Sequence, residues 1–425
     1  MTSGGQLAPP RSEPAGEMTP NSILLFSHSP FYRLNDTIFF DTQAQNGLRL
    51  YTENFDVVRI MAPLVEDRQD GLPSGASALK PFLEAHPTVE PVMLPRRGTI
   101  KFLTQDLRRG RKIIREKIAE SQYLVFGFSG YIGDWGTVSC RTAARMGRSY
   151  AVFKDLVGPR SERIYQRKMQ RSAPRRLLDR LKNILMEYSD RQVVRGSALA
   201  LLHGRDTLDY YSAFASNPQL VHNIHISKAD HISEAALTKR LEKRDPNMLN
   251  LSYAGRVEEV KGPDDWVRAI EGALHHGTRL SATWYGTGVL LEAQRKQVAD
   301  RGLQNNVTFA GFVDHKQMLS RIRASDIFLF THLTEESPRC LIEALSMGLP
   351  LVGYDSAYPR DLVGNSQAGL FVARGDTEAL SRALKELSAD PERLKAMALD
   401  ARRVAEPLND VDVFRHRSDI IKEAL

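Results

Sequence analysis

Two carboxylates eight residues apart, Glu335 and Glu343, flank the start of a predicted helix over residues 338–347. Ser337 and Pro338 are residue types favoured at the N-cap and at the first helical position. The first turn would then present free backbone N–H groups, which attract anions. These groups belong to Arg339, Cys340 and Leu341. Glu335 would lie near the reacting end of a bound ligand, and Glu343 could accept two hydrogen bonds from a vicinal diol. In the structural alternative, Glu335 is an acid favoured at a helix N-terminus and Glu343 pairs with an arginine.

A second group of residues with chemical potential lies between a predicted strand and a predicted helix. It consists of Gly255, Arg256, Lys261, Gly262 and Pro263. Gly255 would let the backbone approach a ligand closely, and Pro263 suits the first helical position. Arg256 and Lys261 would then stand beside a helix N-terminus, which is a natural site for phosphate. The alternative is an ordinary loop with two solvated cations.

The elements that must position these residues alternate along the chain. Short apolar runs predict strands, with helical patterns between them. In the first half the predicted strands cover residues 22–27, 57–61, 123–127, 150–153 and 199–203. In the second half they cover residues 249–253, 280–285, 307–310, 326–330 and 349–353. This rhythm predicts an α/β fold with parallel sheets covered on both faces, in which ligands bind at the carboxyl ends of the strands.

The prediction for the whole chain is two Rossmann-like, doubly wound domains that face each other across a cleft. The first twenty residues contain four prolines and three glycines and no apolar core, which indicates a flexible tail rather than a signal peptide. The expected divisions are a tail at 1–20, an N-terminal domain at 21–222, a linker at 223–245, a C-terminal domain at 246–405 and a last helix within 406–425.

From Met248 to Arg402 the sequence resembles the retaining glycosyltransferases of family four, which have the GT-B fold. The resemblance rests on ordered segments rather than on one motif. These are 253–256 with 261–262, 284–288, 307–313, 335–352, 369–372 and 375–380. It implies that the N-terminal domain is the acceptor side, that the C-terminal domain binds the donor, and that the last helix packs back on the N-terminal domain.

The resemblance also implies an activity and residue roles. The enzyme would be a hexosyltransferase that moves a sugar from a nucleotide-sugar donor, with retention, to a glycan acceptor. Arg256 and Lys261 would hold the donor diphosphate and stabilise the leaving group. Glu343 would hold the ribose, Glu335 would contact the transferred sugar near its anomeric carbon, and Val313 would flank the base. The remaining donor-site candidates are Gly255, Ser337, Arg339, Cys340 and Leu341. No metal or other cofactor is expected, because cations and helix termini replace the metal and no Asp-x-Asp lies near a strand end.

The sequence departs from the family's pattern in three places. After Glu335 the family has Gly-Phe-Gly, whereas residues 336–338 are Glu-Ser-Pro, so Glu336 offers an alternative register with Glu343. The first strand ends in Ser-His-Ser-Pro instead of a Gly-Gly loop, and residues 128–135 contain no histidine. The acceptor-side candidates, at predicted strand ends facing the cleft, are His28, Ser29, Tyr131 and Asp134. A lone histidine such as His28 can equally be structural.

Composition and charge limit the partners. Hydrophobic residues make up 42% of the 425 residues and charged residues 26%, which excludes a mostly disordered chain and a polytopic membrane protein. Two cysteines, Cys140 and Cys340, exclude a disulfide scaffold and a cysteine-based zinc site and fit a reducing cytosol. No apolar run approaches the roughly 20 residues that span a bilayer. A cytoplasmic protein is therefore expected.

Two basic segments, residues 96–117 and 159–195, carry nine and eleven Lys and Arg against two and four acids. Within the second, an apolar helical stripe is predicted. It comprises Leu177, Leu178, Leu181, Ile184, Leu185 and Tyr188. The basic segments could be solvated helix faces, or they could contact an anionic inner membrane face that carries a polyprenyl-diphosphate-linked acceptor. The apolar stripe could instead pack in the core of the protein. No nucleic-acid motif accompanies the charge, so nucleic acid is not expected.

The expected pathway is synthesis of an exopolysaccharide, a capsule or a lipopolysaccharide. Two other functions stay open on the sequence alone. A sugar-nucleotide epimerase of the GT-B fold would keep the donor half, and a non-catalytic glycosyltransferase-like subunit would bind nucleotide without transferring a sugar.

Overall fold

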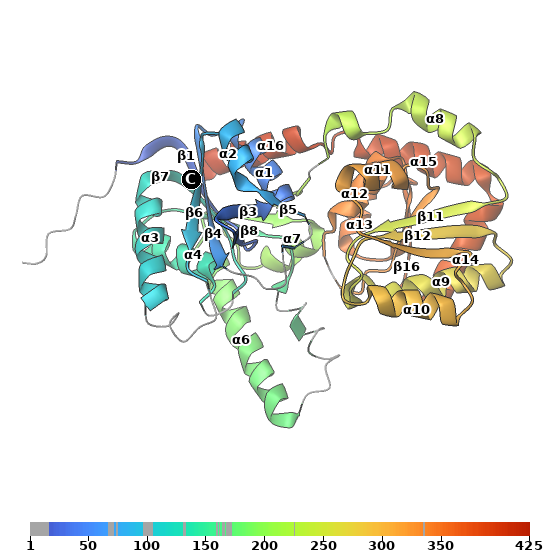
Figure 1. Ribbon diagram of the computed structural model, residues 1–425, viewed down its shortest axis with the longest axis horizontal. Coiled ribbons are helices and arrows are strands. Elements are labelled where there is room, and N and C mark those ends of the chain that lie inside the picture. The colour runs from blue at the N-terminus through green and yellow to red at the C-terminus, as the bar shows by residue number, and fades with distance from the viewer. Residues whose placement is uncertain are drawn as a thin grey trace, which may run out of the picture.

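Two β-sheets, each covered by helices on both faces, organise the computed structural model (Figure 1). The structure describes residues 17–66, 72–73, 75–96, 105–130, 133–158, 160, 162–163, 166, 172–224, 226–334 and 336–425. Within these residues the first half forms one sheet and the second half forms the other, as expected for two Rossmann-like domains.

The N-terminal sheet is mainly parallel, with an antiparallel edge. Its strands are β1 (Thr19–Phe26), β2 (Phe31–Leu34), β3 (Thr37–Asp41), β4 (Val57–Glu66), β5 (Ala76–Ala78), β6 (Val89–Leu94), β7 (Ser121–Gly127), β8 (Ala151–Lys154), β9 (Leu199–His203) and β10 (Pro218–Val221). Their order in the described residues is β10-β9-β8-β7-β1-β4-β2-β3-β5, with β6 also paired to β4. Its helices are α1 (Thr42–Thr52), α2 (Leu79–Ala85), α3 (Leu107–Glu120), α4 (Trp135–Arg145), α6 (Ala173–Arg195) and α7 (Arg205–Tyr211).

The C-terminal sheet is entirely parallel in the order β13-β12-β11-β14-β15-β16. Its strands are β11 (Leu249–Ala254), β12 (Leu280–Tyr285), β13 (Val307–Gly311), β14 (Ile327–Phe330), β15 (Leu351–Tyr354) and β16 (Gly369–Val372). Its helices are α8 (Glu234–Glu242), α9 (Pro263–His275), α10 (Leu291–Asp300), α11 (His315–Ile322), α12 (Arg339–Ser346), α13 (Ala357–Val363), α14 (Thr377–Ala389) and α15 (Pro391–Ala405). Its central strands are apolar runs because helices cover both faces; all four residues of β14 are buried.

The antiparallel edge of the N-terminal sheet has no counterpart in the prediction. Strands β2 and β3 form a hairpin, and β5 pairs with β3. The hairpin turns at Asn35 and Asp36, whose φ angles are +47° and +59°. These residue types tolerate the left-handed region, so the turn has a local cause. The strands escaped prediction because they are short and mostly half-exposed, which blurs their apolar pattern.

The segment predicted as a linker, residues 223–245, contains a helix of the C-terminal domain. In α8, Leu237 is fully buried. Arg240 donates to the carbonyl oxygens that follow α11 and α12, and burial lowers its pKa to about 10. At the start of the chain, residues 1–16 of the predicted tail lie outside the described part, and Thr19 and Pro20 already belong to β1.

The last helix, α16 (Asp410–Ala424), returns to the N-terminal domain and packs against α1 (Figure 1). The ring of Phe414 meets that of Tyr51 edge-on at 5.1 Å. Lys422 donates from Nζ to the carbonyl oxygen of Asn54 at 2.6 Å. The last residues of the chain therefore form part of the N-terminal domain's core and surface.

Helix α6 projects from the body of the N-terminal domain (Figure 1). The six side chains of the predicted apolar stripe, Leu177 to Tyr188, are 52–63% exposed. The interpretation of this stripe as core is therefore wrong for the described chain, whose α6 buries other residues such as Met186 and Val194. Within the described part, no helix combines the length and the apolar character needed to cross a membrane.

Candidate functional site

The loop after β11 comes into close contact with the end of β14 at the carboxyl edge of the C-terminal sheet. Gly262 has φ = +65°, and a Cβ at this position would lie 2.2 Å from the carbonyl oxygen of Thr331. The Thr331 hydroxyl donates to the carbonyl oxygens of Gly262 and Lys261, at 2.8 and 3.1 Å. Pro263 takes the first position of α9, as predicted. This packing fixes Lys261 beside a helix N-terminus.

The two predicted phosphate ligands have different surroundings. Lys261 is 9% exposed, and its Nζ donates to Oε1 of Glu336 at 2.7 Å. The Arg256 side chain is 72% exposed and pairs with Glu258 at 3.0 Å. An exposed ion pair is worth little, so Arg256 can turn towards a ligand at small cost. Lys261 would instead exchange one anion, the partly buried Glu336 carboxylate, for another.

The Glu336 carboxylate is the centre of a small polar cluster. Its Oε1 lies 3.8 Å from Nδ1 of His332, whose Nε2 is 2.7 Å from the Tyr253 hydroxyl. Burial lowers the pKa of His332 well below its usual value, and nearby Lys261 lowers it further, so this ring is neutral. The sequence predicted Glu336 only as an alternative to Glu335 in the motif with Glu343. The predicted catalytic residue Glu335 lies outside the described residues.

Helix α12 begins one residue later than predicted. Pro338 is its N-cap, and the Ser337 hydroxyl donates to the carbonyl oxygen of His203 at 2.7 Å instead of capping the helix. The backbone N–H of Leu341, expected to be free, donates to the Pro338 carbonyl oxygen at 3.2 Å because the first turn is tight. Burial raises the pKa of the Cys340 thiol to about 12, so the thiol stays protonated.

Glu343 lies one turn inside α12 and is 8% exposed. It accepts a hydrogen bond from Nε2 of His315, the first residue of α11, at 2.9 Å. This bond raises the pKa of His315. The structural alternative expected an arginine at Glu343, and the partner is this histidine instead. Val313, which precedes His315 by two residues, is half-buried against the core of the C-terminal domain.

Two of the predicted acceptor-side residues, His28 and Asp134, lie together. Nε2 of His28 is 3.1 Å from Oδ1 of Asp134, which caps α4 and accepts from the backbone N–H of Thr137 and Ser129 at 2.9 and 3.1 Å. Burial acts to raise the pKa of Asp134, but the hydrogen bonds with His28 and these N–H groups outweigh it and lower the pKa to about 2. Such a carboxylate holds the His28 ring in place rather than accepting a proton.

The other two acceptor-side candidates contribute less. The backbone N–H of Ser29 donates to the Ser27 hydroxyl at 3.1 Å, which shapes the loop after β1. Tyr131 lies outside the described residues. The His28 side chain is 48% exposed, and its Nε2 contacts Asp134.

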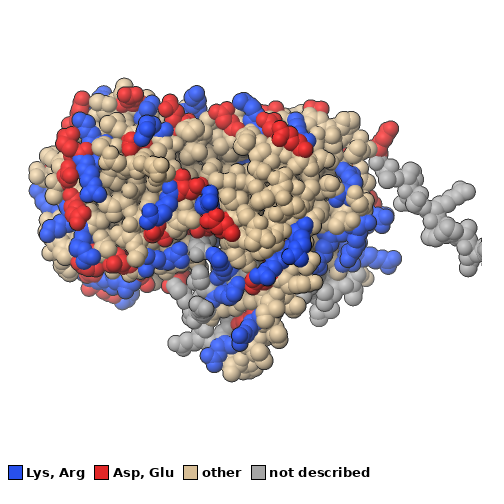
Figure 2. All heavy atoms as spheres, turned by 180° about the vertical axis from the view of Figure 1, so that it is seen from behind, with Lys and Arg blue, Asp and Glu red and all other residues tan. Residues whose placement is uncertain are grey.

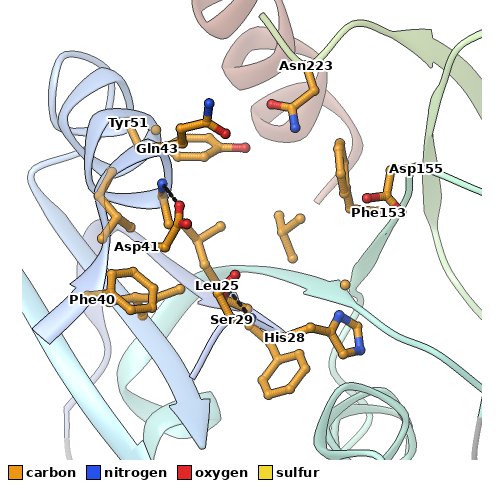
Figure 3. A pocket seen from close by; sticks show the side chains of 18 of the residues that line it. Leu25, His28, Ser29, Phe40, Asp41, Gln43, Tyr51, Phe153, Asp155 and Asn223 are labelled. Atoms are coloured by element: carbon orange, nitrogen blue, oxygen red, sulfur yellow. Dashed lines mark hydrogen bonds between the residues drawn. The ribbon is translucent and has the colours of Figure 1, made fainter. Parts of the chain in front are cut away.

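A cavity of about 320 Å³ lies beside His28 and Ser29 at the carboxyl ends of the N-terminal strands (Figure 3). Its walls come from β1, α1, the end of β8, α16 and the start of α12. Apolar side chains such as Phe40 and Phe153 line its interior, and polar groups such as Asp155 and Asn223 also border it. A concave apolar site with a few polar groups is typical of a ligand site.

Arg339 connects the two sides of the molecule. It belongs to the first turn of α12, and its Nη2 donates to Oε1 of Gln43 in α1 while its side chain lines the cavity. Arg339 was predicted to contribute to the donor site through its backbone N–H group. Nothing in the sequence marks Gln43 or the cavity residues Asp155 and Asn223, since no motif surrounds them.

The described His, Cys, Asp and Glu side chains form no group of three or more that could hold a metal ion. Metal independence was predicted from the resemblance and stays a prediction.

Comparison with known proteins identifies the C-terminal half. The family model of the Glycosyl transferases group 1 matches residues 238–404, which include β11 to β16 and the polar cluster around Lys261. The match covers less than half of the chain. The chain is similar to an alpha-D-kanosaminyltransferase of Streptomyces kanamyceticus, at 24% identity over 59% of this chain and 67% of the relative. It is also similar to a 2-deoxystreptamine N-acetyl-D-glucosaminyltransferase of Streptomyces fradiae, at 31% identity over 41% of this chain and 40% of the relative.

The fold extends the likeness to the whole molecule. Anabaena HepE in complex with UDP superposes with a TM-score of 0.66 over 95% of this chain and 100% of that chain, at 14% identity. The prediction of the GT-B fold is confirmed, and so is the prediction that the chain is a glycosyltransferase.

Proposed function

We propose that this glycosyltransferase moves a sugar, with retention of the anomeric configuration, from a nucleoside-diphosphate sugar to a hydroxyl group of a glycan acceptor. The observation that carries the proposal is the position of buried Lys261 at a helix N-terminus and next to the first turn of α12, with Glu343 one turn further along. Cations and helix N-termini stabilise phosphate, and a carboxylate accepts hydrogen bonds from a ribose diol.

The residues have separate parts in the transfer. The acceptor hydroxyl oxygen forms the new bond to the anomeric carbon, and the bond from that carbon to the β-phosphate oxygen breaks with its electron pair. The hydroxyl proton passes to the departing phosphate oxygen, on the face that attack and departure share. Lys261 leaves Glu336 for the diphosphate and, with Arg256, stabilises its growing charge. Glu343 exchanges His315 for the ribose, and Glu335 contacts the transferred sugar.

Calorimetric titration with UDP, GDP, ADP and CDP tests the donor site. UDP comes first because the HepE structure holds it. We expect one nucleotide to bind selectively to the wild type, and Glu343→Ala to weaken that binding at least tenfold. Asp300→Ala, which removes an exposed carboxylate of α10, is the control and should bind normally. Absence of binding to any nucleotide by a folded sample would instead favour a non-catalytic subunit, and turnover of a nucleotide sugar without an acceptor would favour an epimerase.

The acceptor in this proposal is lipid-linked, at the inner face of a membrane, within the synthesis of a cell-surface glycan. Support comes from α6, whose apolar stripe is flanked by the exposed basic residues Arg175, Arg176, Arg180 and Lys182. Figure 2 shows uncharged (tan) surface on this projecting helix with Lys and Arg (blue) beside it. An exposed apolar stripe with basic flanks matches an anionic bilayer, where the apolar side chains enter the interface and the cations meet headgroups.

Flotation with vesicles of phosphatidylglycerol and phosphatidylcholine tests this membrane contact. Wild type should float with the anionic vesicles at low salt. Leu181→Gln with Leu185→Gln should stay in the soluble fraction. Leu399→Gln, which changes an exposed leucine on α15, should behave as wild type. Flotation of the α6 variant to the same extent as wild type would remove this helix from the proposal.

A further inference from the structure

Two arginines that are far apart in the sequence line the cavity of the N-terminal domain. Arg417 comes from α16, and Arg339 comes from the first turn of α12. Arg417 is 3% exposed, and its guanidinium lies over the rings of Phe414 and Phe153, at 4.5 and 5.2 Å from their centroids. Its Nη2 donates to the His222 carbonyl oxygen, whereas its buried Nε has no hydrogen-bond partner among the residues that the structure describes.

Neither guanidinium has an acidic partner in the described part of the chain. No described carboxylate oxygen lies within 4.0 Å of Arg417 or Arg339. Two carboxylates do border the cavity, but Asp41 is used to cap α1 through the backbone N–H of Ala44, and Asp155 is exposed to solvent. A buried charge is costly unless it is paired, and a buried N–H without an acceptor adds to that cost. Within the described residues, the two guanidiniums therefore keep N–H donors without an acidic acceptor.

We infer that this cavity binds a phosphate ester of the acceptor, with the phosphate on Arg417 and Arg339 and the organic part against the apolar walls formed by residues such as Phe40 and Tyr51. The inference rests on the proposed function and names the chemical class of its acceptor. A guanidinium presents several N–H donors in one plane, which suits phosphate oxygens. A phosphate monoester or diester also has enough oxygens to satisfy both arginines at once. The cavity volume, about 320 Å³, is within the range of small-ligand pockets.

The position of Arg339 gives this phosphate site a consequence for catalysis. Arg339 opens the helix whose next turn carries Glu343, the predicted ribose ligand. Its side chain reaches across to Gln43 of the N-terminal domain. A phosphate that binds Arg339 and Arg417 would therefore contact both domains and hold the acceptor beside the donor site. Positioning of this kind lowers the barrier by fixing the two reactants together.

Calorimetry with n-hexyl phosphate tests the inference, with n-hexanol as the neutral analogue. Wild type should bind n-hexyl phosphate at least tenfold more tightly than n-hexanol. Arg417→Gln and Arg339→Gln should each weaken n-hexyl phosphate binding about tenfold to a hundredfold, as expected for the loss of a charge-assisted contact. Arg415→Gln is the matched control, since Arg415 is an exposed arginine on the same helix and pairs with Asp412. It should bind as wild type does.

A UDP titration of the same samples separates this inference from the proposed function. Wild type that binds UDP but shows equal affinity for n-hexyl phosphate and n-hexanol would overturn the phosphate site and leave the donor site standing. If Arg417→Gln shows no thermal unfolding transition, that variant is not folded and its binding cannot be compared with that of wild type. The Arg339→Gln variant then tests the inference, because Arg339 is half-exposed and its replacement should leave the fold intact. Equal binding by Arg339→Gln and wild type would then contradict the inference.

A second arm identifies the source of the phosphate. Phosphatidylcholine vesicles with and without undecaprenyl phosphate are mixed with wild type and with Arg417→Gln. Binding of the protein to the vesicles that needs both undecaprenyl phosphate and Arg417 supports a lipid-linked phosphate. If the protein binds n-hexyl phosphate but does not bind these vesicles, the result supports a soluble phosphate ester.

Discussion

His203 and Ser337 exchange two hydrogen bonds across the boundary between the domains. Nε2 of His203 lies 2.8 Å from the Ser337 carbonyl oxygen, and the Ser337 hydroxyl donates to the His203 carbonyl oxygen at 2.7 Å. His203 ends β9 of the N-terminal domain, and Ser337 precedes α12, whose residues were predicted to bind the donor. The pair therefore fixes the segment before α12 directly to the N-terminal domain.

The glycine that follows His203 should be indispensable to this contact. Gly204 has φ = +80°, and a Cβ there would lie 1.9 Å from the Ser337 hydroxyl oxygen. Gly204→Ala should lower the free energy of unfolding by several kcal/mol, because the clash adds to the backbone strain. Gly277→Ala is the matched control, since Gly277 has φ = +85° but nothing within 4 Å of an added Cβ. It should cost only about 1–2 kcal/mol from strain. Urea unfolding followed by circular dichroism measures both, and equal losses would show that the domains do not meet here.

Acid should weaken the same contact. Burial, with a smaller effect of neighbouring His222, lowers the pKa of His203 to about 3. Between the unfolded value near 6.5 and pH 3, the unfolded chain binds a proton that the folded chain does not, so the free energy of unfolding falls as the pH falls through this window. Above pH 6.5 this contribution is constant. We expect urea unfolding to show a steeper loss between pH 7 and pH 5 in wild type than in His203→Gln, which cannot be protonated. Parallel pH curves would contradict this account.

The strands of the C-terminal domain could be predicted because a parallel sheet covered on both faces needs continuous apolar runs. The predicted strand 280–285 matches β12, and the predicted strand 249–253 falls one residue short of β11. The antiparallel edge of the N-terminal sheet could not be predicted in the same way. Its strands β2, β3 and β5 are short, and their residues are largely half-exposed. Their pairing defines them rather than their composition: β2 pairs with β4, β3 with β2, and β5 with β3.

Part of the candidate site could likewise be predicted from the sequence, and part could not. Local patterns located Lys261 at a helix N-terminus and Glu343 inside the next helix of the motif, since loop and capping signals are encoded in neighbouring residues. Their partners are tertiary: Glu336 is 75 residues from Lys261, and His315 is 28 residues from Glu343. Arg417 lies 78 residues from Arg339, the other arginine of the cavity. Only folding brings these groups together, so no spacing rule could have revealed them.

Lys261 should carry most of the affinity for the donor diphosphate. It is buried, so its contact with phosphate would be little screened by solvent, whereas exposed Arg256 would contribute less. Lys261→Ala should weaken nucleoside-diphosphate binding by about 1.5–3 kcal/mol, roughly tenfold to over a hundredfold. The matched control is Lys296→Ala, which removes an exposed lysine paired with Asp300. Calorimetric titration of both variants with nucleoside diphosphate measures the two affinities. Near wild-type affinity in Lys261→Ala would show that the lysine only neutralises Glu336.

The pKa of His315 should report whether Glu343 holds the ribose. The hydrogen bond to Glu343 is the main reason that this pKa lies above its ordinary value. Glu343→Gln removes the negative charge, so the pKa of His315 should fall towards 6.5, which NMR titration of the ring proton signals can follow. A bound nucleotide whose ribose takes over the Glu343 oxygens should shift the pKa of His315 in the same direction, because the ring loses part of that hydrogen bond. Folded Glu343→Gln should show no further shift when nucleotide is added. If saturating nucleotide leaves the wild-type His315 titration unchanged, the ribose must bind elsewhere, and Glu343 serves to hold α11 against α12.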